Sequence, residues 1–269
     1  IENKQNEVQK DNEKNINSVL NHAIEKSGPV HLNVPMEEPL YGMTTSPLEI
    51  SHITAPMISK PKIDFKSFKK QWQEAKKKLV LVGVNDPNRI HKRWLDLIDA
   101  DPSVILLTET TSNLRLPNAI NSIDTLIAPL ENTDSDFFKI LQPHILLTFG
   151  GMVVSKKIKK ILRDFSPKEH WHVDPYRAYD TYYCLKQHFF MSVNAFFSEL
   201  FKDYGSPKSD YKSLILDQYR VQLNLGNTYL HSVPFSDLKA FETIFSNLPE
   251  RLHLQLANSS TVRYAQLFD

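Results

Sequence analysis

Two short stretches of the chain combine residues that could bind an anion, and the first surrounds a pair of glycines. Gly150-Gly151 follow the apolar run His144–Phe149, and Ser155-Lys156-Lys157 come four residues later. If the run is a parallel strand and Ser155 caps a helix, both lysines lie beside the free amides of a helix N-terminus. The carboxyl end of such a strand is where doubly wound sheets bind ligands. The stretch therefore predicts an anion site with Lys156 and Lys157 beside it.

The same residues have a simpler interpretation. Their spacing matches neither the G-x-G-x-x-G pattern nor the P-loop, so a nucleotide site is not indicated. Lys159 and Lys160 continue the run of lysines, as expected for a solvated basic helix. Taken alone, the residues favour this second interpretation.

The second stretch, Asn258–Arg263, places small polar residues and an arginine after the apolar run Leu252–Leu256. If the run is a strand, the loop after it can form hydrogen bonds to a polar ligand. The planar guanidinium of Arg263 suits a carboxylate or a phosphate. A helix cap followed by a surface arginine explains the residues equally well.

Composition and charge exclude several classes of function. The chain has 269 residues, 32 basic against 31 acidic, so no bulk charge attracts it to nucleic acid or to a membrane. No apolar run approaches the roughly 20 residues that span a bilayer, and the polar N-terminal segment lacks the apolar stretch of a secretory signal. The lone Cys184 excludes an intrachain disulfide and fits a reducing compartment. We therefore expect a cytoplasmic protein. The chain lacks paired-cysteine, HExxH and G-x-S-x-G motifs, so no metal ligands or serine nucleophile are predicted.

The central part of the chain alternates between continuous apolar runs and amphipathic stretches. The runs predict strands at Leu79–Val84, Val104–Thr108, His144–Phe149 and Trp171–Val173, and a short one at Leu126–Ile127. Helices are expected between them, because continuous apolar strands are typical of parallel sheets covered on both faces. The predicted fold is an α/β, doubly wound, mostly parallel sheet over residues 65–204.

Other elements are expected on both sides of this domain. The domain itself is also expected to contain a helix at Phe189–Phe201. The flanking predictions are helices at Asn15–Lys26, Ser213–Leu225 and Asp237–Ser246, strands at Val30–Val34 and Leu252–Leu256, and a linker at Glu37–Pro61.

Three motifs resemble one family of thiamine-diphosphate enzymes. Gly28–Tyr41, with the sequence GPVHLNVPMEEPLY, is similar to the end of the pyrimidine-binding domain of the MenD family of menaquinone biosynthesis. Asn258-Ser259 with Arg263 four residues on looks like the loop that opens this family's diphosphate-binding domain. Trp171–Gln187 resembles the form of the family found in Bacteroidetes-type bacteria. The resemblance covers the whole chain in the right order.

The resemblance implies that the chain is an internal fragment with five parts. Residues 1–42 would end the pyrimidine-binding domain, and 43–64 would be a linker. Residues 65–204 would form the central α/β domain, 205–233 a helical linker, and 234–269 the start of the diphosphate-binding domain. The full-length family enzyme is similar to other thiamine enzymes, with three α/β domains and active sites between the subunits of a dimer or tetramer.

The resemblance also implies an activity and roles for particular residues. The family decarboxylates 2-oxoglutarate and adds the resulting succinyl carbanion to isochorismate, using thiamine diphosphate and Mg²⁺. Ser259, Arg263, Lys156 and Lys157 match substrate-binding positions, and Asn258 matches a cofactor-binding position. Lys157 stands where the family has arginine, so a bidentate contact becomes a point charge.

The family's activating glutamate and metal motif would lie before Ile1 and after Asp269. No catalytic residue is therefore assigned within the chain, and the chain alone is expected to be inactive. Two alternatives remain open. The chain could be a non-catalytic α/β module that binds an anion or a partner, or it could be part of another thiamine enzyme of the acetolactate-synthase type.

Overall fold

The computed structural model describes residues 2–26, 28–35, 63–131, 135–249 and 252–268, and the chain divides into the compact units Ile1–Pro61 and Lys62–Asp269. The N-terminal unit contains helix α1 (Glu2–Lys26). This helix is longer than predicted, because Glu, Gln and Lys favour helices even without an apolar face. A hydrogen bond from Gln9 Nε2 to Glu13 Oε1 (3.3 Å) joins successive turns of its polar part.

The strand predicted at Val30–Val34 is wrong. These residues are exposed, and no ladder pairs them with another described segment. A run of strand-forming residues needs a partner to supply the hydrogen bonds, and the described part of this unit offers none. The predicted linker Glu37–Pro61 lies outside the described residues.

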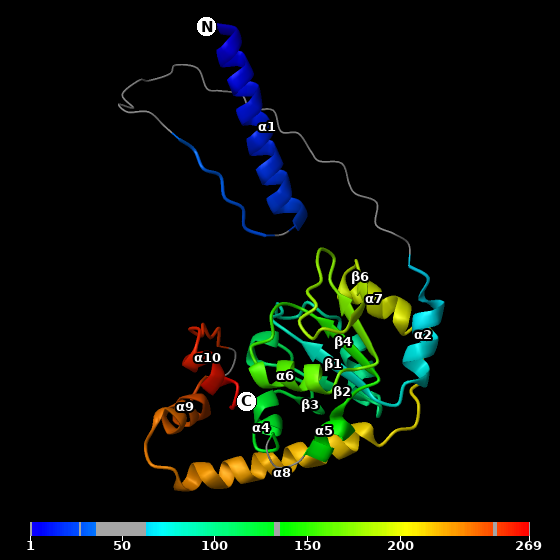
Figure 1. Cartoon of the computed structure of the whole chain (residues 1–269). Coiled ribbons are helices and arrows are strands. Elements are labelled where there is room, and N and C mark those ends of the chain that lie inside the picture. The colour runs from blue at the N-terminus through cyan, green and yellow to red at the C-terminus, as the bar shows by residue number, and fades with distance from the viewer. Residues whose placement is uncertain (1, 27, 36–62, 132–134, 250–251, 269) are drawn as a thin grey trace. The chain divides into compact units, whose positions relative to one another are not determined.

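The second unit is built on a six-stranded sheet, and all of its strand pairs are parallel (Figure 1). The strand order β3-β2-β1-β4-β5-β6 is that of a doubly wound fold, so the predicted fold class is confirmed. The strands are β1 (Lys78–Val82), β2 (Val104–Leu107), β3 (Ala119–Ile120), β4 (Ile145–Phe149), β5 (Glu169–Val173) and β6 (Leu185–Phe189).

Helices cover both faces of the sheet, and alternate residues of the strands divide the core in two. In β1, Val80 and Val82 face one side, and Leu79 and Leu81 face the other. The first side packs against α2 (Phe65–Glu74), α3 (Lys92–Ala100) and α7 (Val193–Leu200). The second packs against α4 (Ile123–Ile127), α5 (Ser135–Leu141), α6 (Lys156–Asp164) and α8 (Tyr211–Ser232).

Two short segments differ from their predicted form. Leu126–Ile127 belongs to α4 and not to a strand, because a short buried apolar run looks the same in a helix and in a strand. Leu252–Leu256 has no strand partner among the described residues and is mostly exposed. That prediction is therefore wrong.

The C-terminal helices continue from the sheet through α8. The hydroxyl of Tyr211, in the first turn of α8, donates to Leu141 O (2.6 Å) and anchors the helix beneath α5. Helices α9 (Asp237–Ser246) and α10 (Ser260–Ala265) then pack together through aromatic rings. Phe241 stacks on Tyr264, with the ring centroids 5.2 Å apart.

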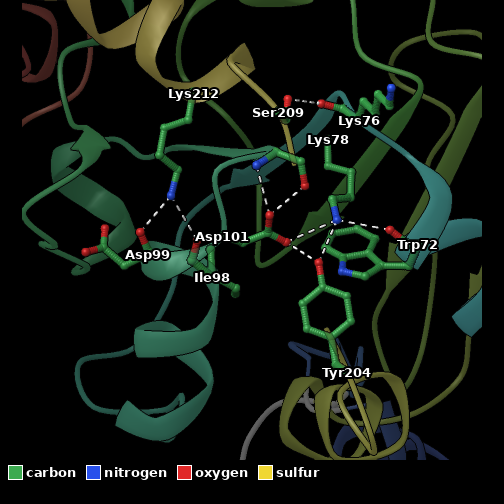
Figure 2. A network of polar contacts seen from close by, with 10 residues as sticks. Trp72, Lys76, Lys78, Ile98, Asp99, Asp101, Tyr204, Ser209 and Lys212 are labelled. Atoms are coloured by element: carbon green, nitrogen blue, oxygen red, sulfur yellow. Dashed lines mark hydrogen bonds and ion pairs between the residues drawn. The ribbon is translucent and has the colours of Figure 1, made fainter. Parts of the chain in front are cut away.

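A buried polar network ties helices to the amino end of the sheet (Figure 2). Lys78, the first residue of β1, is fully buried, and its Nζ donates to Trp72 O (3.0 Å), Asp101 Oδ2 (3.1 Å) and Tyr204 Oη (2.7 Å). The Tyr204 hydroxyl also bonds to Asp101. Burial lowers the pKa of Lys78 to about 8, although Asp101 raises it. The network joins α2, α3 and the segment after α7 at one point.

A second lysine completes this end of the domain. Lys212 of α8 donates through Nζ to Ile98 O (3.2 Å) and Asp99 O (2.7 Å), which are carbonyls at the end of α3. A lysine at the C-terminus of a helix satisfies carbonyls that have no partner within that helix. The amino end of the sheet is therefore held by structural contacts. In the described part of the chain, no helix has the length and apolarity needed to cross a membrane.

Candidate functional site

The carboxyl ends of β1 and β4 meet at the point where the strand order reverses. The two loops contact each other through their backbones, with Gly83 N donating to Phe149 O (3.0 Å) and Gly151 N to Val84 O (2.7 Å). A Cβ atom on Gly83 would lie 1.9 Å from Gly151 O. Gly150 has a φ of +81°, in the region that favours glycine. The glycines therefore let the two loops close on each other, and any ligand must bind outside this contact.

The helix N-terminus that follows these glycines is capped by a buried carboxylate. Glu109, after β2, accepts hydrogen bonds from Val154 N and Ser155 N, both at 2.7 Å. The hydroxyl of Ser155 accepts from Ile158 N (3.2 Å) and donates to Asp124. The protein's own Glu109 therefore bonds the two amides immediately before α6 and places a carboxyl group at the N-terminal end of this helix.

The environment of Glu109 raises the pKa of its carboxyl group. Burial raises the pKa of this carboxyl, and nearby Asp124 raises it further. The two amides and Lys159 lower it, but they do not outweigh the burial. Nothing in the sequence around Glu109 marks it as a cap for α6, because its bonding partners lie about 45 residues further along the chain.

The two lysines of the predicted site, at the start of α6, have different surroundings. Lys156 is exposed at the first helical position. Lys157 forms an ion pair with Glu131, and this pair is only partly exposed. Of the two predicted cations, Lys156 is the one that presents its charge to solvent.

Helix α10 carries the residues of the second predicted stretch. Asn258 Oδ1 accepts from Ser259 N (2.7 Å), and Ser259, at the N-cap position, has a φ of 71°. Ser259 and Arg263 are exposed, while Val262 and Ala265 are buried. The local geometry is that of a helix start followed by an exposed arginine, which is the second of the two interpretations given for this stretch from the sequence.

Helices α6 and α10 both lie at the carboxyl edge of the sheet. Thr110 Oγ1, in the turn after β2, donates to Ala265 O (3.5 Å) and links α10 to this edge. Partial burial lowers the pKa of Lys159, Glu109 raises it, and Arg163, Lys156 and Arg263 lower it further. The structure brings Lys156 and Arg263 to one edge, together with Lys159, which sequence reasoning treated only as part of a basic run.

The chemistry of the described residues suits anion binding better than metal binding. Among them, no group of three or more His, Cys, Asp or Glu side chains could hold a metal ion. Cys184 is half-buried, and burial raises the pKa of its thiol to about 11, which makes it a poor nucleophile. The edge can bind and orient an anion with its cations, and α6 is held in place for this by Glu109.

Replacing Glu109 by glutamine should destabilise the domain by about 1–3 kcal/mol at pH 7, because glutamine keeps only one acceptor oxygen for two amides. The loss should also depend on pH. The pKa of Glu109 is higher in the folded protein than in the unfolded chain. Its protonation therefore contributes fully to stability at pH values below the unfolded pKa, and this contribution is lost as the pH rises through the folded pKa. Glu109→Gln has no titrating group at this position, so the difference in the free energy of unfolding between wild type and variant should narrow as the pH rises. Urea unfolding between pH 4.5 and 7 measures this gap, and a pH-independent gap would contradict the assignment.

Comparison with known proteins gives a consistent result. No protein-family model matches the chain. Curated relatives do, and the three described below are each a 2-succinyl-5-enolpyruvyl-6-hydroxy-3-cyclohexene-1-carboxylate synthase. The protein from Flavobacterium psychrophilum is 44% identical over 97% of this chain and 47% of its own length. The Christiangramia forsetii protein is 45% identical over 100% of the chain and 48% of its own length. The Flavobacterium johnsoniae protein is 42% identical over 96% of the chain and 47% of its own length.

These matches confirm the resemblance seen in the motifs, because they cover nearly every residue of the chain. The chain spans about half the length of the curated relatives that it matches. Over its whole length, the chain is a homologue of the MenD family, the 2-succinyl-5-enolpyruvyl-6-hydroxy-3-cyclohexene-1-carboxylate synthases.

Proposed function

We propose that this chain is part of a synthase that decarboxylates 2-oxoglutarate and adds the succinyl carbanion to isochorismate in menaquinone biosynthesis. The observation that carries the proposal is identity of 42–45% to three such synthases over 96–100% of the chain. The doubly wound unit fits the central α/β domain at residues 65–204, and α9 and α10 fit the start of the diphosphate-binding domain at 234–269.

On this proposal the chain contributes substrate contacts and not the cofactor anchors. Thiamine diphosphate, when bound, supplies the carbanion chemistry. Residues elsewhere in the full-length synthase would hold the metal and most of the cofactor, with Asn258 adding one contact. The chain alone would then be inactive. The complete enzyme would be a cytoplasmic homo-oligomer.

Both substrates are anions, which gives the cations at the carboxyl edge a physical role. Arg263 can donate two parallel hydrogen bonds to a carboxylate, and the hydroxyl of Ser259, at the other end of the same turn, can add a third. Lys156 supplies a point charge from α6. Lys157 would have to release Glu131 before it could contact a substrate.

The direct test is the activity of the purified full-length protein. Incubation with 2-oxoglutarate, isochorismate, thiamine diphosphate and Mg²⁺ should release carbon dioxide and form the succinylated cyclohexene product, followed by mass spectrometry. Turnover of pyruvate would instead indicate an enzyme of the acetolactate-synthase type. Absence of any turnover would leave the non-catalytic module as the better description.

Replacing Arg263 by alanine in the full-length protein should reduce kcat/KM for 2-oxoglutarate or isochorismate by about 10- to 100-fold. This corresponds to the ~1.5–3 kcal/mol of one charge-assisted contact. Binding of thiamine diphosphate, measured by calorimetry, should change much less. Arg220→Ala is a suitable control, because Arg220 is an exposed arginine of α8 that pairs with Asp217. Unchanged kinetics for both substrates would show that Arg263 is only a surface residue.

A further inference from the structure

One face of β4 and β5 carries a buried hydroxyl group between two imidazole rings. Thr148 Oγ1 lies 2.9 Å from His170 Nε2 and 2.8 Å from His172 Nδ1. Thr148 and His170 are buried, and His172 is partly buried. A polar cluster of this kind inside a domain is stable only if its hydrogen bonds are made, so the positions of its hydrogens matter.

The hydroxyl has a single hydrogen, so it donates to one imidazole and accepts from the other. His170 Nδ1 is buried and has no hydrogen-bond partner among the described residues. A hydrogen on that nitrogen would be an unsatisfied buried donor, so we assign the hydrogen of neutral His170 to Nε2, which donates to Thr148. Thr148 then donates to His172 Nδ1. Both bonds are made together only while the two imidazoles are neutral.

A proton added to either imidazole disrupts this arrangement. On His170 it creates a buried N–H at Nδ1 for which the described part of the chain offers no acceptor. On His172 it removes the acceptor of the Thr148 hydroxyl, and the other acceptor nearby, Trp171 O, lies at 3.5 Å. Burial accordingly lowers the pKa of both imidazoles to about 4.

The same face of the sheet holds the loop that joins β5 to β6, residues 174–184. The ring of His170 packs edge-on against Tyr182 of this loop, with the ring centroids 5.4 Å apart. In β6, His188 Nε2 bonds to Asp174 O (2.8 Å) at the start of the loop. Histidines of the sheet therefore contact the loop near both of its ends.

Charged and titratable groups from the loop and from β6 also act on the two imidazoles. The pKa of His170 is lowered by burial and by His172, and Asp180 of the loop raises it. The pKa of His172 is lowered by burial and by His188, and Asp174 raises it. The two carboxylates do not outweigh the burial. The groups that act on Tyr182, which packs against His170, are Glu109, Cys184 and Arg163.

The closed loop also contains a strained residue. Tyr183 has a φ of 59°, in the left-handed region that bulky side chains rarely adopt. Its exposed ring covers the guanidinium of Arg163 (4.4 Å), which also donates to Thr181 O through Nε and Nη2 (2.9 and 2.7 Å). Such strain persists only while the surrounding contacts hold it, and opening of the loop would release it.

We propose that Thr148, His170 and His172 form a proton-sensitive latch, which holds the loop 174–184 against the sheet while both imidazoles are neutral and releases it when they take up protons. In the open loop the two histidines regain the ordinary pKa of 6.5. Between this value and about 4, the open loop binds protons that the closed loop excludes, so opening becomes more favourable as the pH falls. Above pH 6.5 the latch stabilises the closed loop fully. The inference does not depend on the proposed function.

Hydrogen exchange of the full-length protein at pH 7 and pH 5 tests the latch. A suitable reporter is the amide of Cys184, which donates to Asp180 Oδ1 (2.8 Å) at the end of the loop. After correction for the intrinsic exchange rate, its protection should fall at pH 5, by about 20-fold if one histidine takes up a proton on opening and by about 500-fold if both do. Unchanged protection between the two pH values would overturn the proposal.

The amides of β1 show whether the loop opens separately from the rest of the domain. At both pH values the loop amides should be less protected than those of β1, which exchange only when the whole domain opens. Equal protection of the loop and of β1 would mean that the loop opens only in global unfolding, and no latch would then exist.

Two substitutions of similar shape identify the groups that take up the protons. His170→Gln keeps a nitrogen donor near the position of Nε2, and His172→Asn keeps an oxygen acceptor near the position of Nδ1, but neither new side chain titrates. In the double variant, loop protection should change by less than about 3-fold between pH 7 and pH 5. His91→Asn, at an exposed histidine before α3, is the matched control and should keep the wild-type pH dependence. A folded double variant with the wild-type pH dependence would refute the assignment.

Thr148→Val tests the hydroxyl separately, and it serves as well if the double variant does not fold. Valine has nearly the shape of threonine, but it leaves both imidazoles without their shared partner. Loop protection at pH 7 should therefore fall by about 10-fold, which corresponds to one lost hydrogen bond. Thr148→Ser, which keeps the hydroxyl, should restore most of it. Wild-type protection in Thr148→Val would show that the hydroxyl does not hold the loop.

Discussion

Replacing Asp101 by alanine should lower the free energy of unfolding by about 3–5 kcal/mol, because it removes the counter-charge of a buried lysine. Lys78 is fully buried, and in the variant its ammonium would keep only Trp72 O and Tyr204 as partners. Ser103 N and Oγ, which bond to the other oxygen of Asp101, would also lose their acceptor. Urea unfolding followed by tryptophan fluorescence measures the loss.

Two further results would tie this loss to the charge on Lys78. The loss should shrink between pH 7 and 9, since neutral Lys78 needs no counter-charge while the unfolded chain, with a lysine pKa near 10.5, still holds the proton. Adding Lys78→Met to Asp101→Ala should cost little more. As a control, Asp217→Ala removes an exposed ion pair and should change the free energy by less than about 1 kcal/mol. A similar loss in Asp101→Ala and Asp217→Ala would show that the buried pair has no special role.

Replacing Gly83 by alanine should destabilise the domain by at least about 3 kcal/mol. The new Cβ would lie 1.9 Å from Gly151 O and 2.7 Å from Gly151 C, and both of these are backbone atoms that cannot rotate away. The loops after β1 and β4 would have to separate. The hydrogen bonds from Gly83 N to Phe149 O and from Gly151 N to Val84 O would be lost with them.

Gly226→Ala is the matched control for this substitution. Gly226 lies inside α8, and a Cβ there meets nothing within 4 Å. Alanine should therefore stabilise the protein by about 0.5–1 kcal/mol, because it favours the helix without a clash. Opposite signs for the two glycine-to-alanine changes are the expected result in thermal or urea unfolding. Equal stability of Gly83→Ala and wild type would mean that the two loops can separate at little cost.

The sequence predicts the central sheet well because most of its strands are short, continuous apolar runs. β1, β2, β4 and β5 were all expected within a few residues of their observed bounds. β6 was missed because Leu185–Phe189 is an edge strand with Lys, Gln and His inside it, and such a strand has no continuous apolar pattern. Val30–Val34 and Leu252–Leu256 show the opposite error. Their residues favour strands, but their sequences do not reveal whether a partner strand is available.

The candidate site could be predicted only in part. The motifs led to Lys156, Lys157, Asn258, Ser259 and Arg263, and the structure places Lys156 and Arg263 at the same edge of the sheet. The sequence did not reveal that Glu109 accepts the amides of Val154 and Ser155 just before α6, or that Lys157 pairs with Glu131. Both contacts join residues more than 20 positions apart. They depend on how the loops after different strands converge, which local spacing does not encode.

The parallel pairing of β1 with β4 also affects the rate at which this domain folds. β1 pairs with β2, which begins at Val104, and with β4, which begins only at Ile145, so the central pairing closes a long loop of chain. Loops of this kind lose much conformational entropy before any contact stabilises them, so refolding should be slow compared with that of a helical bundle. The amides of β1 are flanked by strands on both sides, and we expect them to exchange with deuterium only when the whole domain opens.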